Sequence, residues 1–268
     1  MKLFKKILLA VACTLAIAES AQAVVVNVGG VVWDTDAVSL TDSDFTARFE
    51  FNQFFTSAVN AVPDVPNAPA NYANAIDPTT TTLGDVLQGV GEVFRFNGVN
   101  YGDTSSPTGG TFCPSCELTF TFGGFSVTGP DTLSNGWLRL YVDDAPDFDV
   151  STSPAANAAD GTLFLELRGV ANEFSTSGGF QSGSLFNYFA VAGGIAAPNF
   201  DTNTQLFASD LLSSASATFF GGQSVATSTG QIFGDSVAAP VPVPEPAPIF
   251  LLGIAMLGFA WLRRKGLK

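Results

Sequence analysis

The chain has 268 residues, of which 46% are hydrophobic and 12% aromatic, while only 13% are charged. It contains 11 basic and 24 acidic residues and no histidine, so its net charge at pH 7 is −13. This composition argues against intrinsic disorder and against nucleic acid as a partner. The lack of histidine excludes Ser-His-Asp and Cys-His catalysis and an imidazole general base.

The first 23 residues have the three parts of a secretory signal peptide. Three lysines precede an uncharged apolar run, and a short polar stretch then ends in Ala21-Gln22-Ala23. We therefore expect a signal helix over residues 1–23, which signal peptidase removes between Ala23 and Val24 during export.

The exported body, residues 24–239, carries the alternation of apolar and polar residues that is typical of strands. In FTARFEFNQFF, Phe45, Ala47, Phe49 and Phe51 alternate with polar residues, and ELTFTFGG, WLRLYVD and TLFLELRG show the same period of two. Further strand candidates are VVVNVGGVVW, EVFRFNG, SLFNYFAV and SASATFFGG. Residues 62–82 indicate a long loop, and TTLGDVLQGVG alone has weak helical periodicity. We predict an all-β body that forms a single antiparallel β-sandwich, with a jelly roll among its candidate topologies.

The body contains one cysteine pair, Cys113 and Cys116, with the spacing of a redox motif. A reactive thiol of that type normally lies at a helix N-terminus, whereas a strand pattern follows this pair. A zinc site would need a second ligand pair, which the mature chain lacks. In an oxidising compartment we expect a structural disulfide between the two residues.

An acidic loop, VDDAPDFDVSTSPAANAADG, joins two of the clearest strand candidates. No lysine or arginine within it neutralises its five carboxylates, and Ca²⁺ with oxygen ligands would relieve their repulsion. The spacing differs from that of an EF-hand, and a solvated turn with aspartates that cap backbone amides explains the same residues without a metal. The candidate calcium ligands are Asp143, Asp144, Asp147, Asp149 and Asp160, and we expect no other cofactor.

The last segment, residues 240–268, has three parts in a fixed order. Val243-Pro244-Glu245-Pro246 comes first, an uncharged apolar run over 247–262 follows, and Arg263, Arg264 and Lys265 come directly after it. Sixteen helical residues span roughly 24 Å, so we predict a short transmembrane helix over 247–262. Because basic residues stay on the cytoplasmic side, the body lies outside.

This arrangement resembles the PEP-CTERM sorting signal of Gram-negative bacteria. The resemblance implies that an exosortase recognises Pro244, Glu245 and Pro246 after export across the inner membrane, to which the C-terminal helix anchors the chain transiently. The protein then reaches the cell surface or the extracellular space. The resemblance also implies an association with exopolysaccharide or the biofilm matrix.

We therefore predict a structural protein of the cell surface or extracellular matrix, sorted by an exosortase system. Between residues 24 and 246 the chain holds four arginines and 23 acidic residues, a net charge of −19. A glycosidase needs only two suitably spaced carboxylates, but no pair stands out, and we expect no enzymatic activity. The alternative is a carbohydrate-binding module whose aromatic side chains stack on sugar rings, with six candidates: Trp33, Tyr72, Tyr101, Trp137, Tyr141 and Tyr188.

Overall fold

The computed structural model describes residues 25–35, 44–101, 111–177 and 179–238. The chain divides into two compact units, Met1–Val237 and Ala238–Lys268, and apart from Ala238 all described residues belong to the first. The predicted signal helix and the predicted transmembrane helix both lie outside the described residues. In the part of the chain that is described, no helix has the length and apolarity needed to cross a membrane.

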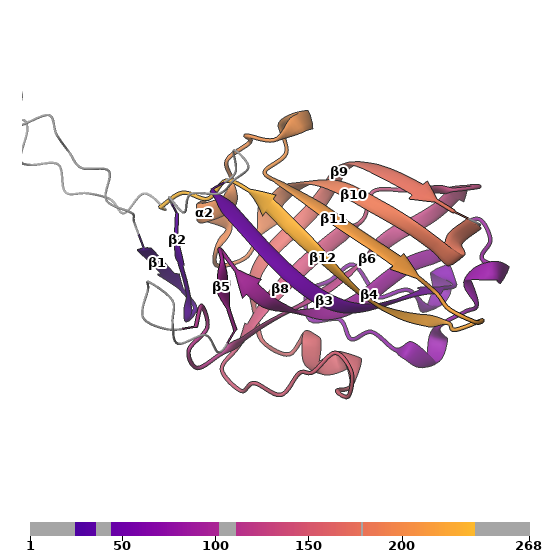
Figure 1. The fold of residues 1–268 in the computed structure, drawn as a ribbon, viewed down its shortest axis with the longest axis horizontal. Coiled ribbons are helices and arrows are strands. Elements are labelled where there is room, and N and C mark those ends of the chain that lie inside the picture. The colour runs from indigo at the N-terminus through magenta and orange to yellow at the C-terminus, as the bar shows by residue number, and fades with distance from the viewer. Residues whose placement is uncertain (1–24, 36–43, 102–110, 178, 239–268) are drawn as a thin grey trace, which may run out of the picture. The chain divides into compact units, whose positions relative to one another are not determined.

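The described residues form strands, one short α-helix and several 3-10 helices (Figure 1). The strands are β1 (Val25–Val28), β2 (Val31–Asp34), β3 (Phe45–Thr56), β4 (Val86–Phe96), β5 (Val99–Asn100), β6 (Glu117–Gly129), β7 (Thr132–Leu133), β8 (Trp137–Asp143), β9 (Thr162–Thr176), β10 (Ser182–Gly193), β11 (Leu211–Thr218) and β12 (Val225–Gly234). The helices are η1 (Ala58–Asn60), η2 (Tyr72–Asn74), η3 (Pro78–Thr80), η4 (Ala155–Ala158), η5 (Gly179–Gln181), α2 (Ala197–Phe200) and η6 (Leu206–Ala208).

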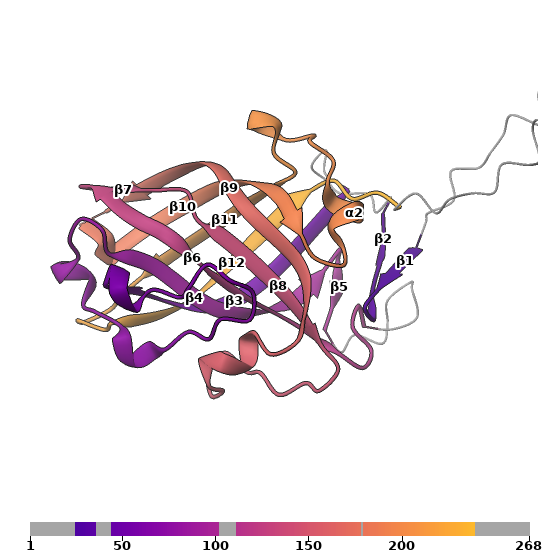
Figure 2. The same cartoon turned by 180° about the vertical axis from the view of Figure 1, so that it is seen from behind.

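Eight long strands form one closed antiparallel barrel (Figures 1 and 2). Strands β3, β4, β6, β8, β9, β10, β11 and β12 each pair with the next, and β12 pairs back on β3, from Gly234 opposite Phe45 to Val225 opposite Phe54. The prediction of a β-sandwich, and with it the jelly roll, is therefore wrong. Period-two alternation shows only that one face of a strand is buried. A strand in a sandwich and a strand in a barrel both bury one face, so the pattern does not distinguish the two folds.

The weak helical pattern in TTLGDVLQGVG is also overturned, because its second half belongs to strand β4. Its glycines occupy inward-facing positions against the aromatic rings of β6. A Cβ atom on Gly89 would clash with the carbonyl oxygen of Asn52 and lie 2.5 Å from Cζ of Phe122. One on Gly91 would clash with the carbonyl oxygen of Glu50 and lie 2.5 Å from Cζ of Phe120. Glycine at these positions leaves the space that the rings fill.

One end of the barrel is filled by Trp33, which the β1–β2 hairpin supplies. Its ring stacks on Phe200 at a centroid distance of 5.5 Å and meets the edges of Phe96 and Phe164. Trp33 Nε1 donates a hydrogen bond to Ser236 Oγ at 3.3 Å. This end of the interior is therefore packed with aromatic side chains and contains almost no exposed surface.

Two long segments, residues 57–85 and 144–161, lie on the outside of the barrel (Figure 2). The predicted loop over 62–82 is thus a loop, interrupted by 3-10 turns. A second apolar cluster lies beneath these segments, and it includes Phe54, Trp137 and Phe148. The side chain of Asn52 donates to the carbonyl oxygen of Val150 at 2.6 Å and so ties one segment to the wall.

A charge network fastens the other segment. The side chain of Arg139 is only 1% exposed, and its Nη2 lies 2.6 Å from Asp64 Oδ1 and 3.0 Å from Glu166 Oε1. Arg168 bonds to the same two carboxylates, and the Arg139 guanidinium lies 4.4 Å from the ring centroid of Trp137. Because a buried charge without its partners is costly, Asp64 holds its loop firmly against β8 and β9.

The glycine positions on β4 generate the first prediction. We expect Gly91→Ala to lower the free energy of unfolding by roughly 1–3 kcal/mol, because the added methyl group overpacks the interior. Gly193→Ala is the matched control, since its Cβ atom would meet no atom closer than 3.6 Å; we expect a change within about 0.5 kcal/mol. Urea denaturation measures both values, and equal changes in the two variants would contradict the packing argument.

Candidate functional site

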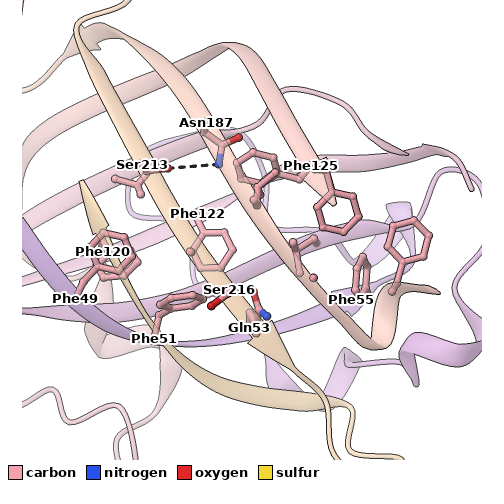
Figure 3. Close-up of a pocket in the computed structure, with 18 of the residues that line it drawn as sticks. Phe49, Phe51, Gln53, Phe55, Phe120, Phe122, Phe125, Asn187, Ser213 and Ser216 are labelled. Carbon is pink, nitrogen blue, oxygen red and sulfur yellow. Dashed lines mark hydrogen bonds between the residues drawn. The ribbon is translucent and has the colours of Figure 1, made fainter. Parts of the chain in front are cut away.

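The barrel interior contains a cavity in the half that lies away from Trp33 (Figure 3). Its volume is about 70 Å³, and its wall is mostly aromatic. Phe180 of η5 packs on Phe55 and Phe174 near this end. The phenylalanines of the wall are Phe49, Phe51, Phe55, Phe120, Phe122, Phe125, Phe174, Phe180, Phe189 and Phe219.

Four polar side chains interrupt this apolar wall: Gln53 of β3, Asn187 of β10, and Ser213 and Ser216 of β11 (Figure 3). Asn187 Nδ2 donates to Ser213 Oγ at 3.5 Å, a long hydrogen bond. Asn187 is 5% exposed, and its Oδ1 atom has no hydrogen-bond partner among the described residues. An unpaired buried acceptor is unfavourable by about 1–3 kcal/mol. The cavity is thus an apolar space with one unsatisfied polar position.

A second recess, the hydroxyl groove, lies on the outside of β9, β10, β11 and β12 and has a volume of about 560 Å³. The strand register places Ser175, Ser184, Ser216 and Thr229 in one row across these strands, and Glu50 of β3 continues the row. The hydroxyls of Ser182 and Thr218 lie in a neighbouring row, 2.9 Å apart. The groove therefore presents many short hydroxyl side chains on a rigid sheet.

The hydroxyl groove has an aromatic edge and almost no charge. Phe220, in the turn between β11 and β12, lines it and is 71% exposed. Of the described residues that line it, Glu50 is the one that carries a charge. Anionic ligands have no basic partner there, and hydroxyls can both donate and accept hydrogen bonds. The geometry and charge therefore suit an uncharged ligand that is itself rich in hydroxyl groups.

A third recess, of about 340 Å³, lies beside the acidic loop and contains Glu92, Glu117 and Tyr101. The backbone N–H of Phe148 donates to Glu117 at 3.1 Å, and that of Val150 donates to Glu92 at 3.2 Å. Both carboxylates thus hold the acidic loop against the barrel, and this contact explains their burial without a catalytic role.

Burial shifts the proton affinities in this recess. Desolvation raises the pKa of Glu117 to about 7, and the negative charges of Asp147 and Asp143 act in the same direction. The pKa of Glu92 is raised by its burial, and the pKa of Tyr101 is raised by burial and by the two glutamates. Protonation of Glu117 near neutral pH therefore relieves a burial penalty.

The predicted calcium ligands lie in this region. Asp144, Asp147, Asp149 and Asp160 are exposed. Asp149 Oδ1 accepts hydrogen bonds from Ser151 Oγ and from Ser151 N, the latter at 2.8 Å, and these two hydrogen bonds lower the pKa of Asp149. Among the described residues, no group of three or more acidic or cysteine side chains is placed to hold a metal ion.

One further feature agrees with aspartates that cap backbone amides, and another shows that acidic side chains of this loop lie near one another. Asp143 Oδ1 accepts a hydrogen bond from Ala145 N at 3.0 Å. The pKa of Asp160 is raised, mainly by desolvation and further by the charges of Asp143 and Asp147. Calcium binding by this loop stays a prediction.

The predicted disulfide is present between Cys113 and Cys116, whose Cα atoms are 5.1 Å apart. Both residues are buried, and Phe112 next to them accepts a backbone hydrogen bond from Val32 at 2.8 Å. The bridge therefore lies against the β1–β2 hairpin, a structural position.

The aromatic residues predicted to stack on sugars are mostly unavailable. Trp33, Trp137, Tyr141 and Tyr188 are buried, with exposed fractions of 8% or less. Tyr101 is exposed, but it borders the acidic recess. The hydroxyl groove was missed because no single motif marks it; the available signal is the alternation of Ser and Thr with small residues over 211–230.

The residues predicted for signal cleavage and for sorting lie outside the described residues, but a comparison with protein families tests the second set. Residues 242–265 match the model of the PEP-CTERM protein-sorting motif. The chain is therefore an exported protein with an exosortase sorting signal, which directs it to the cell surface. No curated protein and no solved structure matches the chain.

The buried glutamate predicts the pH dependence of stability. Unfolded, Glu117 titrates near 4.5, and folded it titrates at about 7. Between these two pKa values the folded protein holds more protons at Glu117 than the unfolded chain does, so the free energy of unfolding falls as the pH rises through this window. Glu117 contributes up to about 3 kcal/mol to this fall, which levels off above the folded pKa.

Thermal unfolding from pH 4.5 to 8 measures this dependence. We expect Glu117→Gln to remove most of the fall, because glutamine does not ionise. Asp144→Asn removes one exposed carboxylate from the same loop and is the control. A wild-type profile that rises over this window, or one that Glu117→Gln leaves unchanged, would show that Glu117 does not control it.

Proposed function

We propose that this exosortase-sorted protein is a structural component of the cell surface or extracellular matrix that associates with exopolysaccharide. The observation that carries the proposal is the hydroxyl groove, with its row of Ser and Thr side chains and the exposed ring of Phe220. Sugar chains present hydroxyls and apolar ring faces, which such a surface complements.

Electrostatics support an uncharged stretch of polysaccharide as the partner. The body is strongly acidic, with a net charge of −19 over residues 24–246. A polyanion approaching it is repelled at low ionic strength. Neutral sugars avoid this repulsion, and the short side chains of the groove lose little conformational entropy on binding.

We infer that the protein acts by binding and not by catalysis. The two glutamates that line the acidic recess are both engaged by backbone amides of the acidic loop. A carbohydrate-binding module remains the second candidate function, and the exposed ring of Phe220 favours it. The two candidates differ in specificity, because a structural protein need not discriminate between sugars.

The groove proposal predicts a loss of polysaccharide binding when its hydroxyls are removed. We expect the triple variant Ser184→Ala, Ser216→Ala and Thr229→Val to bind isolated exopolysaccharide at least about tenfold more weakly, since each lost hydrogen bond weakens binding by roughly 0.5–1.5 kcal/mol. Thr162→Val, an exposed threonine of β9 outside the groove, is the control.

Co-sedimentation of the mature protein with the polysaccharide measures this binding. Retention of the triple variant at the wild-type level would refute a role for the groove. Binding to one sugar type alone, with no binding to others, would favour the carbohydrate-binding module over the structural protein.

The sorting signal predicts a processing defect in Glu245→Ala. We expect this variant to keep its C-terminal segment and to stay in the membrane fraction, because the exosortase no longer recognises the box. Asp235→Asn, seven residues before the motif match, is the control. Intact-mass measurement and fractionation check the result, and release of Glu245→Ala with an unchanged C-terminal mass would contradict it.

A further inference from the structure

The hydroxyl groove and the aromatic cavity share part of their walls. Gly183 of β10 and Ser216 and Ala217 of β11 line both spaces. The ring of Phe174 packs against Gly183, whereas at Ala217 only backbone and a methyl group lie between the exterior groove and the interior.

The strand pairing explains why the wall is thin here. The pairing between β11 and β12 ends at Ser216 opposite Thr229. Strand β11 nevertheless continues to Thr218, and β12 already begins at Val225. The two strands therefore separate toward their connecting turn, where Phe220 lies, and the groove occupies the place of separation.

The two spaces have opposite chemistry and unequal size. The cavity is lined mainly by phenylalanine and measures about 70 Å³, well below the roughly 300–1,000 Å³ of sites for whole small-molecule ligands. It has room for a short apolar group only. The groove is polar and measures about 560 Å³, enough for a sugar-sized head group.

The cavity also has a feature that simple packing does not explain. Asn187 Oδ1 is buried without a partner and lines this space. A well-packed apolar core excludes such atoms or pairs them. An unpaired amide oxygen in an apolar cavity is common to ligand sites, where a few polar groups orient the bound molecule.

We infer that the groove and the cavity form one site for a neutral amphiphile, a molecule with an uncharged hydroxyl-rich head and an alkyl chain. The head lies in the hydroxyl groove, and the first part of the chain passes beside Ala217, where β11 no longer pairs with β12, into the cavity. The choice of a sugar-like head rests on the proposed function. Glu50 and the acidic body disfavour an anionic head.

Octyl glucoside below its micelle concentration is the test ligand, and titration calorimetry on the mature protein is the measurement. We expect it to bind at least about tenfold more tightly than glucose, since each buried methylene adds favourable transfer free energy. Octyl sulfate, with the same chain and an anionic head, is expected to bind more weakly than octyl glucoside.

Ala215 lines the cavity and not the groove, so it separates the two halves of the site. We expect Ala215→Phe to reduce octyl glucoside binding to the level of glucose while polysaccharide retention stays unchanged. Ala215→Val, a smaller change, should weaken octyl glucoside binding partially and keeps the test valid if the phenylalanine variant does not fold. Thermal unfolding verifies the fold of both variants.

Octyl glucoside that binds no better than glucose, or whose binding both Ala215 variants leave unchanged, overturns the inference. If polysaccharide retention still depends on the groove hydroxyls in that case, the proposed function survives and only the amphiphile site fails. If retention is indifferent to the hydroxyls but octyl glucoside binding depends on Ala215, the proposed function fails and the amphiphile site stands.

Discussion

The pairing of β3 with β12 is the interaction on which the rest of the structure depends. These strands come from opposite ends of the described chain and pair over their whole common length, which closes the sheet into a barrel. Closure removes the two free edges that an open sheet of this length would expose to other chains. It also defines an inside, and the phenylalanines of every second position fill it.

The filling of that inside is uneven, and the unevenness creates the site. At one end Trp33 packs among aromatic rings and leaves no space. At the other end β11 and β12 separate beside Ala217, which lines both the cavity and the groove. The small side chain of Ala217 thus leaves a thin partition between an apolar cavity and a polar groove.

The outer face is organised by a different kind of force. Two long segments cover one side of the barrel and are held there by buried polar contacts: Arg139 binds Asp64, and Glu117 accepts the amide of Phe148. Such contacts favour one geometry because every misplaced charge or amide would be left unpaired. Among the described residues, no comparable segment covers the side where the hydroxyl groove lies.

The sequence by itself determined the local features: the inward faces of β3 and β6, the cysteine bridge, and the sorting motif that the PEP-CTERM match confirms. These follow from short-range chemistry, since the pleat repeats every two residues and neighbouring cysteines need no distant partner. Three features were decided only by the tertiary structure. They are the choice of a barrel over a sandwich, the position of Gly89 and Gly91 within a strand, and the alignment of Ser184, Ser216 and Thr229 in one row. Each of these depends on which strands become neighbours, and that choice is set by contacts between residues far apart in the chain, which no local pattern encodes.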